Sequence, residues 1–134
     1  MAALAANKHV KRKEPRYITL PVAASTIIYA GAMCMANAAG TVVPGADTAA
    51  HSRVGIATEK VDNSAGAAGA LECKFEREGV YQFAYSGTAP NIGDTVYFVD
   101  DQTVGIAATT TNDIKVGVAV TDGASSLVWV DIAQ

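Results

Sequence analysis

The residue types needed for catalysis are sparse, and where they cluster their spacing does not suit a catalytic site. Asp47, His51 and Ser52 could supply an acid, a base and a nucleophile, but they share one short polar stretch. A catalytic serine is often presented on a sharp glycine-flanked turn between a strand and a helix, which this stretch lacks. The other histidine, His9, lies in a basic segment near the N-terminus. We therefore expect no enzymatic activity and interpret His51 as a solvated loop residue.

The sequence also lacks the patterns that hold metals, phosphates or cofactors. Cys34 and Cys73 lie in separate apolar runs without C-x-x-C or Cys/His spacing, so we expect buried free thiols, which fit a reducing compartment. The pair Asp100-Asp101 lacks the spaced oxygen ligands of a calcium loop. No Gly-Lys-Ser/Thr follows the glycines of 66–69, which excludes a phosphate loop there. We expect no metal and no cofactor.

Charge divides the chain into a basic arm, residues 1–16, and an acidic body, residues 17–134. The arm holds five basic residues against Glu14 alone, about +4, while the whole chain has a net charge of −3, which leaves the body at about −7. A basic arm on an acidic body often marks an interaction segment, whose partner could be nucleic acid, an acidic protein surface or the body of a neighbouring copy. A solvated terminus without a partner is the alternative. The acidic body argues against direct nucleic-acid binding.

One stretch resembles a secretory signal. Lys11-Arg12-Lys13 is basic, residues 18–36 are largely apolar, and Ala36-Asn37-Ala38 resembles a cleavage site. However, Pro21 and Gly31 interrupt the apolar run, and the residues from Gly31 onward belong to an internal repeat. We therefore expect this stretch to fold with the body, and the same interruptions argue against a transmembrane helix.

The internal repeat places residues 31–57 over 93–119 after a shift of 62 positions. The most specific pairing is Arg53-Val54-Gly55-Ile56-Ala57 with Lys115-Val116-Gly117-Val118-Ala119. A further pairing, 71–75 with 127–131, needs a gap of six residues. The pattern predicts two related units.

Alternating apolar residues and turn residues predict short strands in both units. The expected strands of the second unit are 95–99, 103–107, 114–120 and 127–132, and those of the first are 27–29, 33–35, 41–43, 54–59, 71–77 and 79–85. In 114–120, Ile114, Val116, Val118 and Val120 should share one face. No stretch has sustained helical periodicity. We expect an all-β protein, a small β-barrel or sandwich, with residues 17–134 forming a single domain.

The run Gly93-Asp94-Thr95-Val96-Tyr97, the strand 114–119 with its Gly117 and Ala119, and the final valine-rich strand resemble the capsid decoration proteins of tailed bacteriophages. These are also called cement or head-stabilising proteins, and the resemblance covers residues 17–134. It implies a β-tulip-like fold and a structural, non-enzymatic protein made in the host cytoplasm. It also implies binding to the major capsid protein on the outer surface of the virion, assembly as a homotrimer, and stabilisation of the shell against internal DNA pressure. Neither a membrane nor nucleic acid is expected as a direct partner.

The residues expected to contact the capsid or a neighbouring subunit lie in the arm and just after it. They are Lys8, Lys11, Arg12, Lys13, Arg16, Tyr17, Ile18 and Leu20. The basic side chains could reach an acidic surface and orient docking. Ile18, Leu20 and Val22 could instead add a strand to an adjacent subunit, or form an ordinary first strand of the domain.

Two alternatives remain open from the residues alone. A secreted or surface β-adhesin would require cleavage near Ala36-Asn37-Ala38. A small-ligand-binding β-barrel would require an enclosed apolar cavity. Apolar residues on both faces of 96–99 indicate either a surface covered by a partner or a two-sided core.

Overall fold

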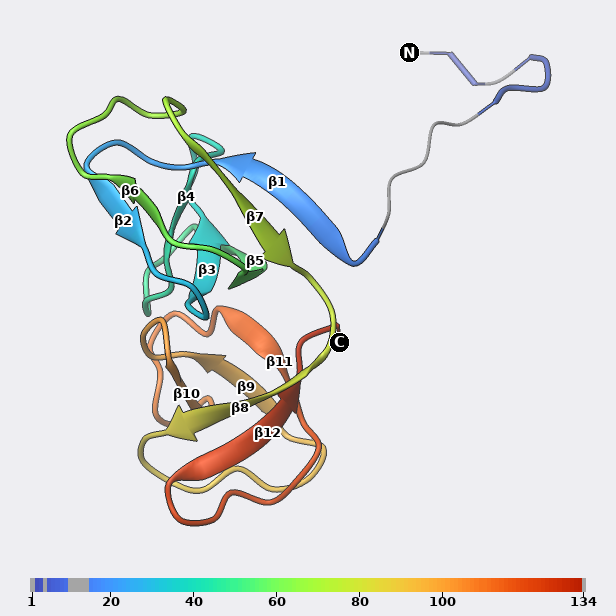
Figure 1. The fold of residues 1–134 in the computed structure, drawn as a ribbon. Helices are drawn as coiled ribbons and strands as arrows, with labels where there is room; N and C mark the ends of the chain where they lie inside the picture. The colour runs from blue at the N-terminus through green and yellow to red at the C-terminus, as the bar shows by residue number, and fades with distance from the viewer. Residues whose placement is uncertain (1, 4, 10–14, 134) are drawn as a thin grey trace.

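The computed structural model describes residues 2–3, 5–9 and 15–133, and in this part of the chain every regular element is a strand. Twelve strands form two units, one above the other in Figure 1, with the strands of the first unit, β1–β7, preceding those of the second, β8–β12. The expected all-β fold is confirmed. No helix in the described ranges is long and apolar enough to cross a membrane.

The first unit is a five-stranded sheet with a small two-stranded sheet beside it. The large sheet has the order β1-β7-β5-β3-β4, and β2 pairs with β6. The bounds are β1 Tyr17–Pro21, β2 Thr26–Ile28, β3 Met33–Ala36, β4 Val42–Pro44, β5 Ser52–Ala57, β6 Val61–Asn63 and β7 Glu72–Glu76. Residues 18–36, the stretch that resembles a secretory signal, thus contribute to three strands of this unit.

The second unit is a closed five-stranded barrel with the order β10-β8-β12-β11-β9. Its strands are β8 Val80–Tyr85, β9 Thr95–Phe98, β10 Thr103–Gly105, β11 Lys115–Ala119 and β12 Leu127–Asp131. A parallel pairing of β8 with β10 closes the barrel.

The two units share one strand order, in which β1, β7, β5, β3 and β4 correspond to β8, β12, β11, β9 and β10. Backbone hydrogen bonds recur at matching places: Gly31 N–H donates to Ala57 O at 2.8 Å, and Gly93 N–H to Ala119 O at 2.9 Å. Even the barrel closure has a counterpart, since Val22 forms a parallel bridge with Val42 in the first unit. That the two units arose by duplication stays a prediction.

The likeness also fixes how the last strands correspond. A Cβ atom on Gly55 would lie 2.3 Å from Glu76 O, and one on Gly117 would lie 2.2 Å from Asp131 O. Because these glycines correspond, Glu76 corresponds to Asp131. Residues 72–76 of β7 therefore align with 127–131 of β12, whereas the sequence alone pairs 71–75 with 127–131.

The prediction that the aliphatic residues of 114–120 share one face is wrong. A β-bulge between Lys115 and Gly117 shifts the pairing of β11 with β9, and an extra residue in one strand reverses which side chains point inward. Val116 and Ala119 are therefore both buried, whereas Val120 is exposed.

Two clusters of buried side chains form the core. One lies inside the first unit and includes Cys34, Cys73 and Phe75, so the prediction of buried free thiols is confirmed. The other fills the barrel and continues across the junction to Met33, Met35 and Ile56 of the first unit. The two units are thus joined by shared apolar packing as well as by the chain.

Candidate functional site

The expected contact residues lie in β1 and in the sequence before it. Lys11, Arg12 and Lys13 lie outside the described residues, and Lys8 is exposed. Arg16 is also exposed, and its Nε donates to Glu76 Oε2 of β7 at 3.0 Å. This hydrogen bond is the main cause of a raised pKa for the Arg16 guanidinium.

Tyr17 lies between two cations on the outer side of the first sheet. The Arg16 guanidinium is 5.2 Å from the centre of the Tyr17 ring, and the Lys74 ammonium is 4.4 Å from it. Both distances are within the range of a cation–π contact. Arg16, Tyr17, Lys74 and Glu76 together fix the point at which the arm leaves the body.

Ile18 and Leu20 serve the core of their own unit. They pair with Phe75 and Cys73 in the β1–β7 ladder, and their half-buried side chains pack against the core cluster of the first unit. β1 is therefore an ordinary first strand of this chain.

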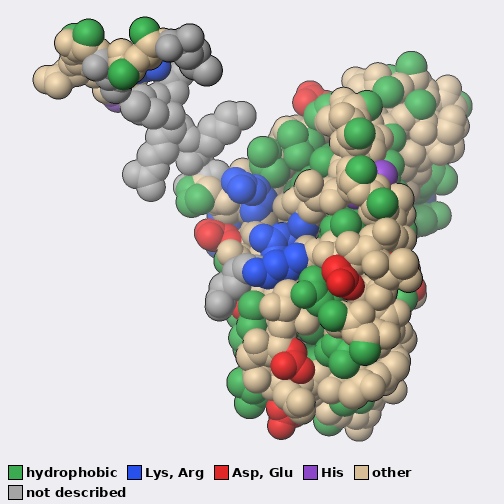
Figure 2. All heavy atoms as spheres, turned by 180° about the vertical axis from the view of Figure 1, so that it is seen from behind, with side chains coloured by type: hydrophobic (Ala, Val, Ile, Leu, Met, Phe, Trp, Pro, Cys, Tyr) green, Lys and Arg blue, Asp and Glu red, His purple; other side chains and the backbone are tan. Residues whose placement is uncertain are grey.

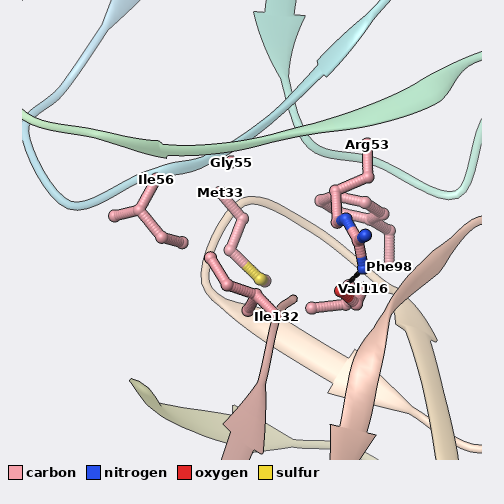
Figure 3. A pocket seen from close by; sticks show the side chains of 7 residues that line it. All are labelled: Met33, Arg53, Gly55, Ile56, Phe98, Val116 and Ile132. Carbon is pink, nitrogen blue, oxygen red and sulfur yellow. Dashed lines mark hydrogen bonds between the residues drawn. The ribbon is translucent and has the colours of Figure 1, made fainter. Parts of the chain in front are cut away.

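The junction between the units is dry and closely packed. Met33 and Ile56 from the first unit meet Phe98, Val116 and Ile132 from the second (Figure 3), and no space large enough for a water molecule remains between them. An enclosed ligand cavity, which the small-ligand alternative requires, does not lie here.

Arg53 of β5 joins the units by a polar contact at the edge of this junction. Its Nη1 donates to the backbone carbonyl of Val116, the residue displaced by the β-bulge in β11 (Figure 3). Burial lowers the pKa of Arg53, and the charge of Arg77 lowers it further, while Asp131 raises it. Arg53 and Arg77 line one groove with Glu78, and Figure 2 shows basic side chains gathered at the level of the junction.

Sequence reasoning did not identify this role of Arg53. Its acceptor is a backbone carbonyl 63 residues away, and a carbonyl has no residue type for a pattern to reveal. The only available signal was the basic residue that precedes Val-Gly in both units.

Two of the residues considered for a catalytic triad, Asp47 and His51, bind backbone groups elsewhere. The Asp47 carboxylate accepts hydrogen bonds from the backbone N–H groups of Thr111 at 2.7 Å and Asn112 at 2.9 Å. These bonds lower the pKa of Asp47 and tie its loop to the second unit. His51 contacts Ala49 O through Nδ1 at 2.9 Å. Across 2–3, 5–9 and 15–133, no group of three or more His, Cys, Asp or Glu side chains is placed to hold a metal ion.

The outer face of the barrel carries an apolar patch that sequence reasoning also missed. We define the Trp129 face as Val80, Val120, Leu127 and Trp129, all large apolar residues that the fold leaves exposed. Residues 96–99, which the sequence indicates as either a covered surface or a two-sided core, do not form such a patch. Val96 and Phe98 are buried in the core, and Tyr97 and Val99 are half-buried.

Comparison with known proteins gives one family and one solved structure. The family model described as phage cement protein matches residues 10–132. The solved structure is described as the crystal structure of head fiber gp8.5 N base in bacteriophage phi29, with 18% sequence identity, 87% of this chain and 93% of that chain covered, and a TM-score of 0.46. No curated protein matches the chain.

The family match begins at residue 10, within the basic arm, and extends through the whole first unit to the last strand of the barrel. The resemblance that the sequence predicted is thereby confirmed. The chain belongs to the phage cement protein family, and it is a structural protein of the virion that binds the capsid.

Proposed function

We propose that the protein binds the outer capsid surface as a homotrimer, bridges neighbouring capsomers, and stabilises the shell without any catalytic step. A protein that binds only where capsomers remain adjacent adds its binding free energy to their association, by mass action. This stabilisation opposes the outward pressure of packed DNA. The family match over residues 10–132 carries the proposal.

The construction of the body supports a mechanical role. Met33, Met35 and Ile56 of the first unit share a core with the barrel, and Arg53 adds a hydrogen bond across the junction. Closely packed interiors have low compressibility and transmit strain. Two units joined in this way can therefore carry a load between contacts at their opposite ends.

A role without catalysis is supported by the hydrogen-bond partners of Asp47. The Asp47 carboxylate is engaged by Thr111 and Asn112 of the other unit, so it does not orient the imidazole as a triad would require.

The test uses expanded capsids prepared without this protein. Purified full-length protein is added, unbound protein is removed, and quantitative mass spectrometry gives the number of copies per major capsid protein. We expect near-stoichiometric binding and a higher temperature of DNA release from filled capsids. Absence of binding, or binding that leaves the release temperature unchanged, would contradict the proposal. Native mass spectrometry should show three chains of 13.8 kDa in one particle.

We also propose that the basic arm steers docking onto an acidic part of the capsid. Replacing Lys8, Lys11, Arg12 and Lys13 by alanine should slow binding roughly tenfold at low salt, because complementary charge mainly raises association rates. The difference should shrink at high salt. The control replaces Lys60 and Lys115, two exposed lysines of the body, by alanine. Loss of the trimer with unchanged capsid binding would instead assign the arm to a neighbouring copy.

A further inference from the structure

The Trp129 face spans three neighbouring strands, with Gln82 and Asp131 on the same side of the sheet. In the β8–β12 ladder, Trp129 lies opposite Gln82, Leu127 opposite Ala84, and Val80 opposite Asp131. On the other side, Val120 N–H donates to Trp129 O at 2.9 Å, directly after β11. The intervening residues of β12, Val128 and Val130, are buried in the barrel core. The four apolar side chains therefore project from the outer side of the barrel, where β12 runs beside β8 and β11 (Figure 1).

At three of the four corresponding positions the first unit has a polar residue; the fourth, Val80, corresponds to Tyr17, which pairs with Glu76 as Val80 pairs with Asp131. Because Glu76 corresponds to Asp131, Leu127 and Trp129 correspond to Glu72 and Lys74, both of which are exposed. Thr58 takes the place of Val120: its N–H donates to Lys74 O at 3.0 Å, as the N–H of Val120 does to Trp129 O.

This difference shows that the fold itself does not require apolar side chains at these positions. The position of Leu127 in the barrel is held by Glu72 in the first unit, and the position of Trp129 is held by Lys74. Trp129 is the only tryptophan of the chain, and it is 43% exposed. A tryptophan exposed among other large apolar side chains is typical of a binding surface.

We propose that the Trp129 face docks on the capsid, against a neutral apolar patch of the major capsid protein, with Trp129 as the central anchor. This inference rests on the proposed function and assigns a surface to it. The size of the face favours the capsid over a second copy of this chain. Four partly exposed side chains present on the order of 300 Å², whereas a stable pairwise interface buries about 800 Å² on each partner.

A small contact is sufficient on a shell because it is repeated. Once one chain of an oligomer is bound, the others bind at a high effective concentration, so weak individual contacts add up to firm attachment. The basic arm and the Trp129 face would then have separate tasks, the arm accelerating encounter and the apolar face slowing release.

The first experiment measures capsid binding by co-sedimentation with expanded capsids for a matched pair of leucine variants. Leu127 in the Trp129 face is 42% exposed, and Leu71 in the first unit is 44% exposed. We expect Leu127→Lys to weaken capsid binding about tenfold or more, and Leu71→Lys to bind as the unchanged protein does. Trp129→Lys, which introduces the type of residue found in the first unit, should weaken binding further. Circular dichroism and thermal unfolding check that each variant is folded.

The second experiment uses the fluorescence of Trp129 in the isolated protein, without capsids. Quenching by acrylamide should stay efficient as the protein concentration is raised through the range in which oligomers form. If Trp129 becomes protected at high concentration, the face joins copies of this chain and the proposal is overturned. Equal capsid binding by Leu127→Lys and the unchanged protein would overturn it as well. Failure of the unchanged protein to bind capsids would contradict the proposed function itself, so the two failures are distinguishable.

Discussion

Gly55 and Gly117 allow another strand to approach more closely than any side chain would permit. Each lies where a Cβ atom would meet a backbone carbonyl, that of Glu76 for Gly55 and that of Asp131 for Gly117. Backbone atoms in a paired strand cannot move away as the end of a flexible side chain can. These two glycines are therefore required by the pairing of β5 with β7 and of β11 with β12.

Gly117→Ala should lower the free energy of unfolding by about 2–3 kcal/mol, because the added methyl group overpacks a site bounded by backbone. Urea denaturation measures the change. Gly93→Ala is the control: Gly93 has a φ of +90° and open space around its Cα, so alanine there should cost only about 1 kcal/mol of backbone strain. Equal losses for the two variants would contradict the close approach at Gly117.

The buried thiols make stability depend on alkaline pH. Burial raises the pKa of Cys73 to about 11, and the charge of Glu59 contributes to this, while burial raises the pKa of Cys34 further. Since the unfolded thiols have pKa values near 8.5, the folded protein binds more protons between that pH and about 11. Stability should therefore fall as pH rises through this window.

The measurement is the free energy of unfolding by urea at pH 8 and pH 10, under reducing conditions. We expect the loss of stability between these values to be smaller when both Cys34 and Cys73 are replaced by alanine. The cavities that alanine leaves lower the stability equally at pH 8 and pH 10, so they do not affect the difference between the two values. A double variant with the same slope as the unchanged protein would mean that other groups cause the alkaline loss.

At the scale of elements, the sequence predicted the strands well where β-branched and aromatic residues alternate. Strands β3, β9 and β12 begin and end within two residues of the expected ranges. β6 was missed because Asp62 and Asn63 are typical of turns, whereas in the structure Asn63 is buried and its amide donates to Ala23 O. The prediction of one shared face for the aliphatic residues of 114–120 is wrong because a bulge interrupts the period of two. A pattern of residue types does not reveal where an extra residue is inserted.

The candidate site was predictable only in part. Charge along the sequence identified the basic arm, which needs no tertiary information. The Trp129 face was missed because apolar residues occupy both sides of β12, and the sequence does not tell which side points into the barrel. Arg53 was missed because its acceptor, Val116 O, belongs to another strand and another unit.

The hydrogen bond from Arg53 of β5 to Val116 O of β11 leads to a testable prediction about how the two units are joined. Arg53→Met keeps the aliphatic stem but removes the donor to Val116 O, and a buried carbonyl left without its donor costs about 1–3 kcal/mol. We expect a loss of about 2 kcal/mol in thermal or urea unfolding. Lys115→Met is the matched control, because Lys115 takes the corresponding place in the second unit and is exposed; it should change stability little. A loss as large for Lys115→Met would show that charge, and not the hydrogen bond, is responsible.

For the whole molecule, the central question is whether the two units unfold separately. The first unit has its own core around Cys34, Cys73 and Phe75, which could remain folded alone. However, the barrel core includes Met33, Met35 and Ile56 from the first unit, so loss of either unit exposes apolar surface of the other. Shared burial of this kind couples the two stabilities. A cement protein benefits, because a body that yields at its junction could not hold capsomers together.

The chain contains a native probe in each unit for testing this coupling. Trp129 reports on the barrel, and the two thiols, both within the first unit and both buried, report on the first unit through pulsed labelling with a thiol reagent. We expect the fluorescence transition and the labelling transition to coincide along a urea gradient, as they must in a two-state process. The labelling pulse must be short compared with refolding, so that it records the equilibrium population. If the thiols become reactive at a lower urea concentration than the one that shifts the Trp129 emission, the first unit unfolds independently. The junction would then be too weak to transmit load, and the proposed bridging of capsomers would have to rest on one unit alone.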